Sequence, residues 1–529
     1  MSKRRLLFYS DARHTHIYCY DPPLRVEDAV APVDEVAGTG VDTFVYGFGT
    51  GPTMYHNTRV GETWAEHLAK AGQPIHESHG SPVWALCFWR AYENIKSLRE
   101  RGLDIMTLLI DRAHEKGLEF FGSLRMNHPQ DPKFKDTADN STFKIEHPEW
   151  CLAGLGKYAF NWIHPEVRAE RMALIEETLG QYDLDGMEID WVFEPHYFEE
   201  DAVDQNAHII TEFMAEVRQA VDRAAAARGR AIFLGARVLP TLQMNRAAGL
   251  EVPAWIRDGS MDFVVPTVYG LRQVDGDFPF EWLVEWAQGV ECEVYPALLD
   301  QVLSVETSGL HQEHRRIRKH PAQVEHFRAG AAAYWARGAD ALYLPWFRWP
   351  VQAEERQILS ELHDPDLIAE KPKHYFARSR EDEAEHGSHE YVRTAPLPLT
   401  LETGLDAPDQ TVRMFVADDP ARADGRLRIK LIGSVRQDAM TFSLNGEALP
   451  LETAARTTHG GGGNIYVWLE FPVPDGVLQE GDNEVGVALH ARPENLVGKV
   501  IWEAAELLVA YPGPVANTPL DRLAAVNRA

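Results

Sequence analysis

Apolar residues recur in short runs along the first 360 residues, and segments with a helical period separate most of these runs. Eight of the runs are rich in β-branched and aromatic residues, as strands are. Among the segments between them, residues 164–180 place Met172, Ile175 and Leu179 on one helical face and end at Gly180. The eight expected strands cover residues 5–11, 41–47, 118–127, 184–192, 231–238, 262–269, 292–300 and 341–349.

This alternation predicts an α/β fold with parallel strands, because parallel neighbours need a crossover helix between them. At this length a closed (β/α)8 TIM barrel is the economical arrangement, and an open doubly wound sheet is the alternative. Neither GxGxxG nor GxxxxGK[ST] follows any of the eight runs, so the usual sequence evidence for a nucleotide is missing. We expect no cofactor.

The pattern changes after about residue 360, where the chain becomes polar and highly charged. From about residue 395 only strand-type runs remain, and Asn445-Gly446 is a strong hairpin turn. This pattern predicts a C-terminal β-sandwich domain, with a structural or a sugar-binding role. The expected divisions are the barrel at 1–365, a charged connector at 366–394, the β-sandwich at 395–515 and a C-terminal tail at 516–529.

The composition narrows the range of partners. The chain of 529 residues has a formal net charge of -28, which repels nucleic acid and anionic membranes. No window approaches the roughly 20 apolar residues that would span a bilayer, and no signal peptide is recognisable at the start, so a cytoplasmic location is expected. The four cysteines form no CxxC pair and support neither a zinc knuckle nor a disulfide framework.

One predicted strand carries an unusual density of acidic residues. In DGMEIDWV, residues 185–192, alternation places Glu188 and Asp190 on one face and the apolar residues on the other. Asp190 then lies at the carboxyl end of the strand, where barrel enzymes build their active sites. A buried carboxylate without a partner costs several kcal/mol, so the pair indicates a reactive site or structural ion pairs with Arg125 or Arg237.

Other strand ends supply residue types that suit a sugar. A glycosidase needs two carboxyl groups beside the scissile bond, while aromatic planes stack on sugar rings and Asn, Arg and Asp bind hydroxyl groups. The predicted substrate-binding residues are Asp11, Tyr46, Arg125, Asn127, His128, Trp191, Arg237, Tyr269, Trp346 and Trp349.

The motif DGMEIDW resembles the fourth-strand motif of glycosidase-like (β/α)8 barrels, including the family 10-like glycosyl hydrolase group, and is similar to the DGxDxDxE pattern of family 18 chitinases. Asp185, Glu188 and Asp190 match the first three acidic positions, but Val192 replaces the final glutamate, which is the proton donor of that pattern. The resemblance to the family 10-like group extends through SLRMNH (123–128) and HPEVR (164–168). It implies a reaction class without identifying a sugar.

These observations predict a glycoside hydrolase that cleaves a poly- or oligosaccharide by carboxylate acid/base catalysis at the barrel mouth. The expected catalytic residues are Asp190, Glu188, Asp300 and Glu194, with Asp300 favoured over Glu194 as the second acid because it lies on the opposite wall. The alternatives are a non-catalytic carbohydrate-binding barrel, or a metal-dependent isomerase or lyase that would use His14, His16 and His128. No metal site is expected, and the sugar, its linkage and the oligomeric state stay open.

Overall fold

The computed structural model of the chain describes residues 5–12, 17–75, 82–269, 273–307, 315–380, 391, 394–404, 409–461 and 464–511. Within these ranges, eight parallel strands form one sheet in the order β12-β1-β2-β5-β6-β7-β8-β9, and each expected segment supplies one strand. The Leu298 amide donates to the Tyr343 carbonyl at 2.8 Å and joins the two edges, so the barrel is nearly closed. The predicted (β/α)8 barrel is confirmed. Its strands are β1 Arg5–Asp11, β2 Thr43–Gly47, β5 Glu119–Arg125, β6 Gly186–Asp190, β7 Phe233–Val238, β8 Phe263–Pro266, β9 Glu293–Val294 and β12 Ala341–Leu344.

Helices surround this sheet, and their ends follow local sequence signals. Asp104 caps α4 by accepting the amides of Met106 and Thr107, and α6 begins at Pro165, whose missing N–H costs nothing there. The longest helix, α7, ends at Gly229 in the left-handed region. The helices of the barrel region are α1 Val26–Val36, α2 Glu66–Lys70, α3 Pro82–Glu100, α4 Ile105–Glu115, α5 Thr142–Glu146, α6 Pro165–Gln181, α7 Val203–Arg228, α8 Leu242–Ala247, α9 Val252–Arg257, α10 Glu281–Ala287, α11 Val324–Ala336, α12 Ala353–Glu361 and α13 Pro365–Ile368.

Aromatic rings fill the barrel interior. Phe121, Phe263 and Tyr343 belong to one buried cluster of inward-facing side chains. Two strand glycines make room for the rings: a Cβ at Gly186 would lie 2.7 Å from Phe121, and one at Gly235 would lie 2.1 Å from Phe263. The barrel is therefore a packed core, and only its carboxyl-terminal end can hold a site on this axis.

In the described residues, two short strand pairs lie in segments that connect elements of the barrel. The pair β3 Thr53–Met54 and β4 Glu62–Thr63 lies in the long segment after β2. The antiparallel pair β10 Gln301–Thr307 and β11 Arg315–Pro321 lies between β9 and α11, and the hydrophobic pattern did not predict it.

The C-terminal region consists of two antiparallel sheets around a second core, which confirms the predicted β-sandwich. One sheet has the order β13-β22-β16-β20-β19 with β14 also paired to β22, and the other has the order β15-β21-β17-β18. The expected hairpin at Asn445-Gly446 joins β17 to β18. The strands are β13 Lys373–Phe376, β14 Leu399–Leu401, β15 Gln410–Val416, β16 Asp424–Ile432, β17 Ala439–Leu444, β18 Glu447–Ala448, β19 Ala455–Gly461, β20 Asn464–Pro472, β21 Gly481–Ala491 and β22 Val500–Ala510.

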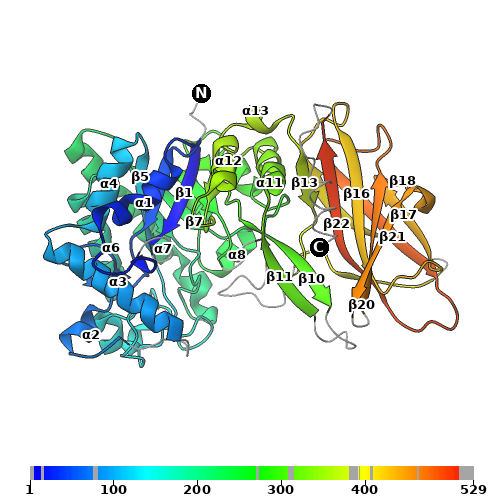
Figure 1. Cartoon of the computed structure of the whole chain (residues 1–529). Helices are drawn as coiled ribbons and strands as arrows, with labels where there is room; N and C mark the ends of the chain where they lie inside the picture. Colours follow the sequence, from blue (N-terminus) through cyan, green and yellow to red (C-terminus); the bar gives the residue numbers. More distant parts are fainter. Residues whose placement is uncertain are drawn as a thin grey trace.

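The junction between the two domains involves the stretch expected to be a connector. Strand β13 lies in that stretch, yet it pairs with β22 and thereby belongs to the sandwich. Figure 1 shows α11 and β13 between the barrel and the remaining sandwich strands. The expected tail, 516–529, lies outside the described residues. Among the helices that the structure describes, none combines the length and apolar character needed to cross a membrane.

Candidate active site

Strand β6 directs its two acidic side chains into the barrel. Met187 and Ile189 are buried in the core between the sheet and the helices. Glu188 and Asp190 alternate with them and meet Arg237 of β7 inside the barrel, where their exposed fractions are 0% and 2%. The period of the strand thus produces the arrangement that the sequence indicated.

Glu188 is the deeper of the two carboxylates. Its Oε1 accepts a hydrogen bond of 2.6 Å from the Ser123 hydroxyl and lies 2.9 Å from Nε of Arg237. Burial raises the pKa of Glu188, and the nearby Asp190 adds to this effect, while Arg237 and Ser123 oppose it. Burial also works against the charge of Arg237, but Glu188, Tyr343 and Asp190 outweigh it and hold its pKa well above the usual value.

Asp190 lies at the end of β6 and organises the loop that follows. Its Oδ1 accepts the amides of Val192 at 2.9 Å and Phe193 at 3.1 Å. Its Oδ2 lies 3.4 Å from Nη1 of Arg237 and 3.9 Å from Nε of Arg125. Two backbone amides and two guanidinium groups therefore hold the carboxyl group of Asp190 in place.

Arg125 extends this arrangement to β1, because its Nη2 lies 3.0 Å from Oδ2 of Asp11. Carboxylates and guanidinium groups therefore alternate across the barrel in the order Asp11, Arg125, Asp190, Arg237, Glu188. We call these five residues the charged layer. Each has an exposed fraction of 5% or less.

Two tyrosines lie directly beneath the charged layer. The guanidinium carbon of Arg237 is 3.8 Å from the centre of the Tyr9 ring, and the same arginine donates a hydrogen bond to the Tyr343 hydroxyl. Burial raises the pKa of Tyr9 to about 12. Burial also raises the pKa of Tyr343, so both tyrosines stay neutral, and they connect the charged layer to the aromatic cluster to which they belong.

Three aromatic side chains lie around Arg125 on its other side. The guanidinium carbon of Arg125 is 4.2 Å from the ring centre of Phe193, 5.6 Å from that of Trp346 and 5.9 Å from that of Tyr269. Tyr269 packs edge-on against Phe193 and Trp346, at 4.5 Å and 5.5 Å between ring centres. Tyr269 and Trp346 are only partly buried, so they present aromatic surface next to the charged layer.

Asn127 was predicted to bind substrate, but its side chain joins loops of the protein instead. Its amide group donates to the carbonyl of His196 at 2.6 Å and of Glu194 at 3.3 Å. Its oxygen accepts the Phe160 amide at 2.6 Å and the His128 amide at 3.1 Å. With these bonds and no exposed surface, Asn127 holds the loops after β5 and β6 together.

The neighbouring His128 is also buried by protein contacts. Its Nδ1 accepts the Gln130 amide at 3.3 Å, its Nε2 lies 3.5 Å from Asp139, and its ring stacks on Phe193 at 5.9 Å. Lys144 donates to the His128 carbonyl at 2.6 Å. The ring of His128 therefore packs against one face of the Phe193 ring.

Glu194 lies on the loop whose start Asp190 holds. Its Oε1 is 3.0 Å from Nδ1 of His196, and its backbone is in the left-handed region at φ 53°. That conformation costs a residue with a side chain of order 1 kcal/mol or more. Glu194 is thus connected to the charged layer through backbone and loop contacts.

Three other predicted residues face away from the barrel interior. Val45 occupies the inward position of β2, so Tyr46 faces outward and packs against Phe120. Tyr46 therefore lies one position away from the inward-facing set and apart from the charged layer. Trp191 likewise faces outward and is fully buried by aromatic rings, with centre distances of 4.8 Å to Trp162, 5.1 Å to Tyr197 and 6.1 Å to Trp255.

The third is Trp349, which the sequence assigned to the end of the eighth strand. Strand β12 already ends at Leu344, and the chain turns so that Trp349 lies beside Glu35 of α1 on the outside of the barrel. Asp300 is buried directly before β10, and its carbonyl accepts the Ala322 amide at 2.8 Å.

Four residues of this region were missed by the sequence reasoning: Tyr9, Ser123, Phe193 and Tyr343. The strand period of two could have identified Tyr9 and Ser123, because they precede Asp11 and Arg125 by two positions and so lie on the same face. Tyr343 faces inward by the same rule applied within β12. Phe193 lies on a loop, where no period applies.

The metal-dependent alternative used three histidines. His14 and His16 lie outside the described residues, and His128 has the contacts given above. Within the described ranges, no group of three His, Cys, Asp or Glu side chains has the arrangement of a metal site.

Comparison with known families gives one match. Residues 76–222 match the family model described as "Glycosyl hydrolase-like 10", a stretch that includes β5 and β6 with Arg125, Glu188 and Asp190. This stretch of the chain is therefore similar to the glycosyl hydrolase-like family. Among curated proteins, none matches the chain.

Solved structures match the chain at low identity and low TM-score. The glycoside hydrolase domain of PgaB (BpsB) from Bordetella bronchiseptica is 10% identical with a TM-score of 0.41, covering 68% of this chain and 98% of that one. The catalytic domain of chitinase B from Arthrobacter TAD20 has the same identity and TM-score, covering 68% and 95%. A cycloisomaltooligosaccharide glucanotransferase from Paenibacillus sp. is 8% identical with a TM-score of 0.34, and this chain covers 57% of its length. Likeness at this level says nothing about the reaction.

Proposed function

We propose that the chain is a glycoside hydrolase that cleaves a poly- or oligosaccharide at the carboxyl-terminal end of its barrel. The observation that carries the proposal is the position of Asp190. It lies at the end of β6, within the glycosyl hydrolase-like stretch, and two amides and two arginines surround it. In (β/α)8 barrel enzymes the catalytic residues come from the carboxyl ends of the strands, which is the position of Asp190.

In this proposal Asp190 is the reacting carboxylate and Glu188 is a positioning residue. Glu188 is fully buried and holds Arg237, which in turn lies beside Asp190. An ionised Asp190 can act on a sugar as a nucleophile or as the base that activates water. The partly exposed rings of Tyr269 and Trp346 offer stacking surfaces for the sugar.

A second carboxyl group is needed as the proton donor, and Asp300 and Glu194 are the two candidates. Asp300 belongs to the segment that follows β9, and Glu194 belongs to the loop that Asp190 itself holds. A separation of roughly 5 to 5.5 Å between the two carboxyl groups would give retention of configuration, and roughly 6.5 to 9.5 Å would give inversion.

One observation favours a non-catalytic carbohydrate-binding barrel as the second candidate function. Val192 stands where the chitinase-type pattern has its proton donor, and its side chain is buried in the barrel core with an exposed fraction of 2%. Position 192 therefore cannot protonate a leaving group. In this alternative the charged layer would serve only structure and ligand binding.

The experiment is an assay of the purified chain against a panel of neutral and charged oligosaccharides, with detection of new reducing ends and of binding. The variant Asp190→Asn keeps the shape of the side chain, so we expect hydrolysis to fall by about three or more orders of magnitude while sugar binding and folding persist. The matched control is Asp183→Asn, because Asp183 precedes the start of β6 and 62% of its side chain is exposed.

Two outcomes would count against hydrolysis at this site. Binding of a sugar without any release of reducing ends would favour the non-catalytic barrel. Near-normal turnover of Asp190→Asn would show that the carboxylate is structural.

A further inference from the structure

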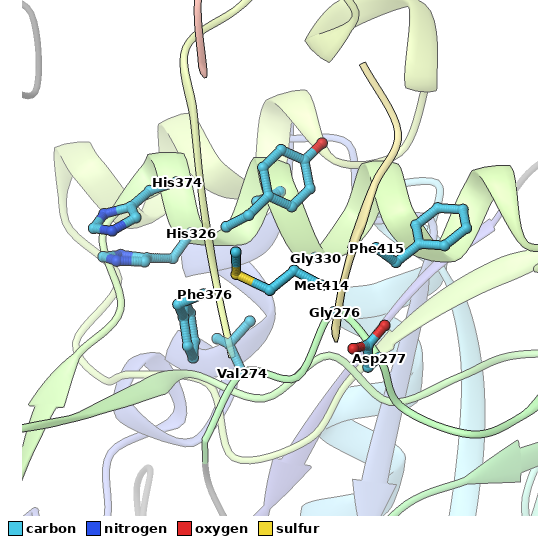
Figure 2. Close-up of a pocket in the computed structure, with 11 residues that line it drawn as sticks. Val274, Gly276, Asp277, His326, Gly330, His374, Phe376, Met414 and Phe415 are labelled. Atoms are coloured by element: carbon cyan, nitrogen blue, oxygen red, sulfur yellow. The ribbon is translucent and has the colours of Figure 1, made fainter. Parts of the chain in front are cut away.

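Two histidines meet at the junction between the barrel and the β-sandwich. His326 lies in the first turn of α11 and His374 on β13, and their rings stack with 4.3 Å between centres and 29° between planes. Figure 2 shows the two rings one above the other at the edge of a cavity of about 10 Å³, which is room for about one water molecule. The exposed fractions of the two residues are 7% and 4%.

The hydrogen bond of His326 defines its protonation state. The backbone amide of Gln323 donates to Nδ1 of His326 at 3.0 Å, within the capping box of α11. A nitrogen that accepts a hydrogen bond carries no proton, so the ring is neutral in this arrangement. Protonation of Nδ1 would place two N–H donors against each other and break the cap.

A carboxylate that already has another partner lies beside the two rings. Nε2 of His374 lies 3.2 Å from Oε2 of Glu506 on β22, and Arg428 on β16 already donates to that oxygen at 2.8 Å. Burial opposes the charge of Glu506, but Arg428 and His374 outweigh it and lower its pKa to about 2. Glu506 is therefore ionised at ordinary pH, but it is shared between two partners.

The remaining elements at the cavity add few charges. On α11, Glu325 is mostly buried, and Arg328 pairs with Glu361 at 2.7 Å. Strand β15 contributes Met414 and Phe415, and β13 contributes Tyr375 and Phe376 besides His374. Burial and the neighbouring His374 lower the pKa of His326 well below its usual value.

We propose that the stacked pair His326 and His374 is a pH-sensitive latch between the barrel and the β-sandwich, closed while His326 is neutral and opened when it takes up a proton. The pH range follows from linkage. Because the closed state binds the proton more weakly than the open state, closure is strongest above the ordinary imidazole value of 6.5 and weakens as the pH falls below it. For a single group, the opening constant rises about tenfold for each pH unit in that range.

Asp277 lines the same cavity, and its protonation has the opposite effect on the junction from protonation of His326. Burial and the neighbouring Asp275 raise its pKa to about 6, while Arg413 of β15, 3.8 Å away, opposes them. Protonation of Asp277 below that pH therefore favours the closed junction. Its effect is the weaker one, because 32% of its side chain is exposed and water screens its charge.

Amide hydrogen exchange of the full chain between pH 8 and pH 5, corrected for the intrinsic pH dependence of exchange, tests the latch. We expect the opening constant of α11 and β13 to rise below pH 6.5, while β1 and β6 in the barrel stay unchanged. His326→Asn keeps an oxygen that can accept the Gln323 amide but has no titratable proton, so it should abolish this rise. His208→Asn, an exposed position on α7, should behave like the unmodified protein.

A second variant isolates the histidine effect. Asp277→Asn removes the opposing group, so opening should depend on pH more steeply than in the unmodified protein. An equal pH dependence in the unmodified protein and in His326→Asn would overturn the proposal, as would no dependence in Asp277→Asn. Circular dichroism of each variant separates opening of the junction from global unfolding.

Discussion

Asp190 and Arg237 are direct neighbours across the pair β6 and β7, and Oδ2 of Asp190 lies 3.4 Å from Nη1 of Arg237. The same guanidinium lies 2.9 Å from Glu188 and donates to Tyr343. One arginine of β7 therefore serves two buried carboxylates of the adjacent strand β6. Its removal leaves both of them with less compensation in a medium where charge is costly.

Replacing Arg237 by Gln should destabilise the protein by about 3–5 kcal/mol, because a buried carboxylate then loses its cation. The free energy of unfolding from urea titration measures this cost. Arg257→Gln is the control, since 63% of that side chain is exposed, and its effect should stay within about 0.5 kcal/mol. If Arg237→Gln lowers the free energy of unfolding no more than Arg257→Gln does, Arg237 does not stabilise the charged layer.

The packed barrel interior gives a second prediction. A Cβ at Gly235 would lie 2.1 Å from the ring of Phe263, so Gly235→Ala should cost about 2 kcal/mol or more through overpacking. At Gly180 in α6 a Cβ meets nothing within 4 Å, so Gly180→Ala should be neutral or slightly stabilising. Thermal unfolding of the two variants makes the comparison, and equal melting temperatures would contradict it.

The barrel could be predicted because its signals are local and repeated. Each of the eight strands has its own apolar run, and the helices between them carry caps such as Asp104 and Gly229 that act over one turn. The inward direction of Glu188 and Asp190 follows from the strand period alone. Tyr46 and Trp191 were misplaced because residue type was weighed above that same period.

The rest of the site depends on contacts that no local pattern contains. Asn127 looks like a hydroxyl-binding residue in the sequence, yet its four bonds go to the backbone of loops 33 or more residues away or to its neighbour. Trp349 was misplaced because the chain leaves the barrel axis after Leu344, beyond the strand's last pair. The strand β13 was hidden in a charged segment because its partner, β22, lies far along the chain.

Glu506 gives a pH prediction for the sandwich. Burial opposes its charge, but Arg428 and His374 outweigh it and lower its pKa to about 2 from 4.5. Its stabilising contribution is therefore full above pH 4.5 and is lost as the pH falls towards 2, with a total of about 3 kcal/mol. Glu506→Gln should be less stable than the unmodified protein at pH 7, and the difference should shrink between pH 4.5 and pH 3. A difference that stays constant over this range would refute the assignment.

Lys144 gives a prediction for the stability of the protein at alkaline pH. It is fully buried, donates to the His128 carbonyl at 2.6 Å, and burial lowers its pKa to about 8. Because its charged form is disfavoured in the fold, Lys144 costs stability below about pH 8, and this cost disappears as the pH rises to 10.5. The unmodified protein should thus gain about 3 kcal/mol relative to Lys144→Met over that range. The exposed Lys157→Met is the control and should follow the unmodified protein in urea titrations at pH 7.5 and 10.

The identity of the second acid can be resolved by the leaving group of the substrate. A proton donor assists departure of a poor leaving group, so its loss should slow cleavage of an oligosaccharide by about 100-fold or more and hardly affect an activated aryl glycoside. Loss of a nucleophile or base slows the cleavage of both substrates.

We therefore expect Asp190→Asn to slow the cleavage of both the oligosaccharide and the aryl glycoside. We expect either Glu194→Gln or Asp300→Asn to slow the cleavage of the oligosaccharide alone. Glu200→Gln, an exposed position beyond the same loop as Glu194, is the control and should leave both rates unchanged. If both Glu194→Gln and Asp300→Asn cleave the oligosaccharide at the unmodified rate, neither residue is the donor and the two-carboxylate mechanism at Asp190 fails.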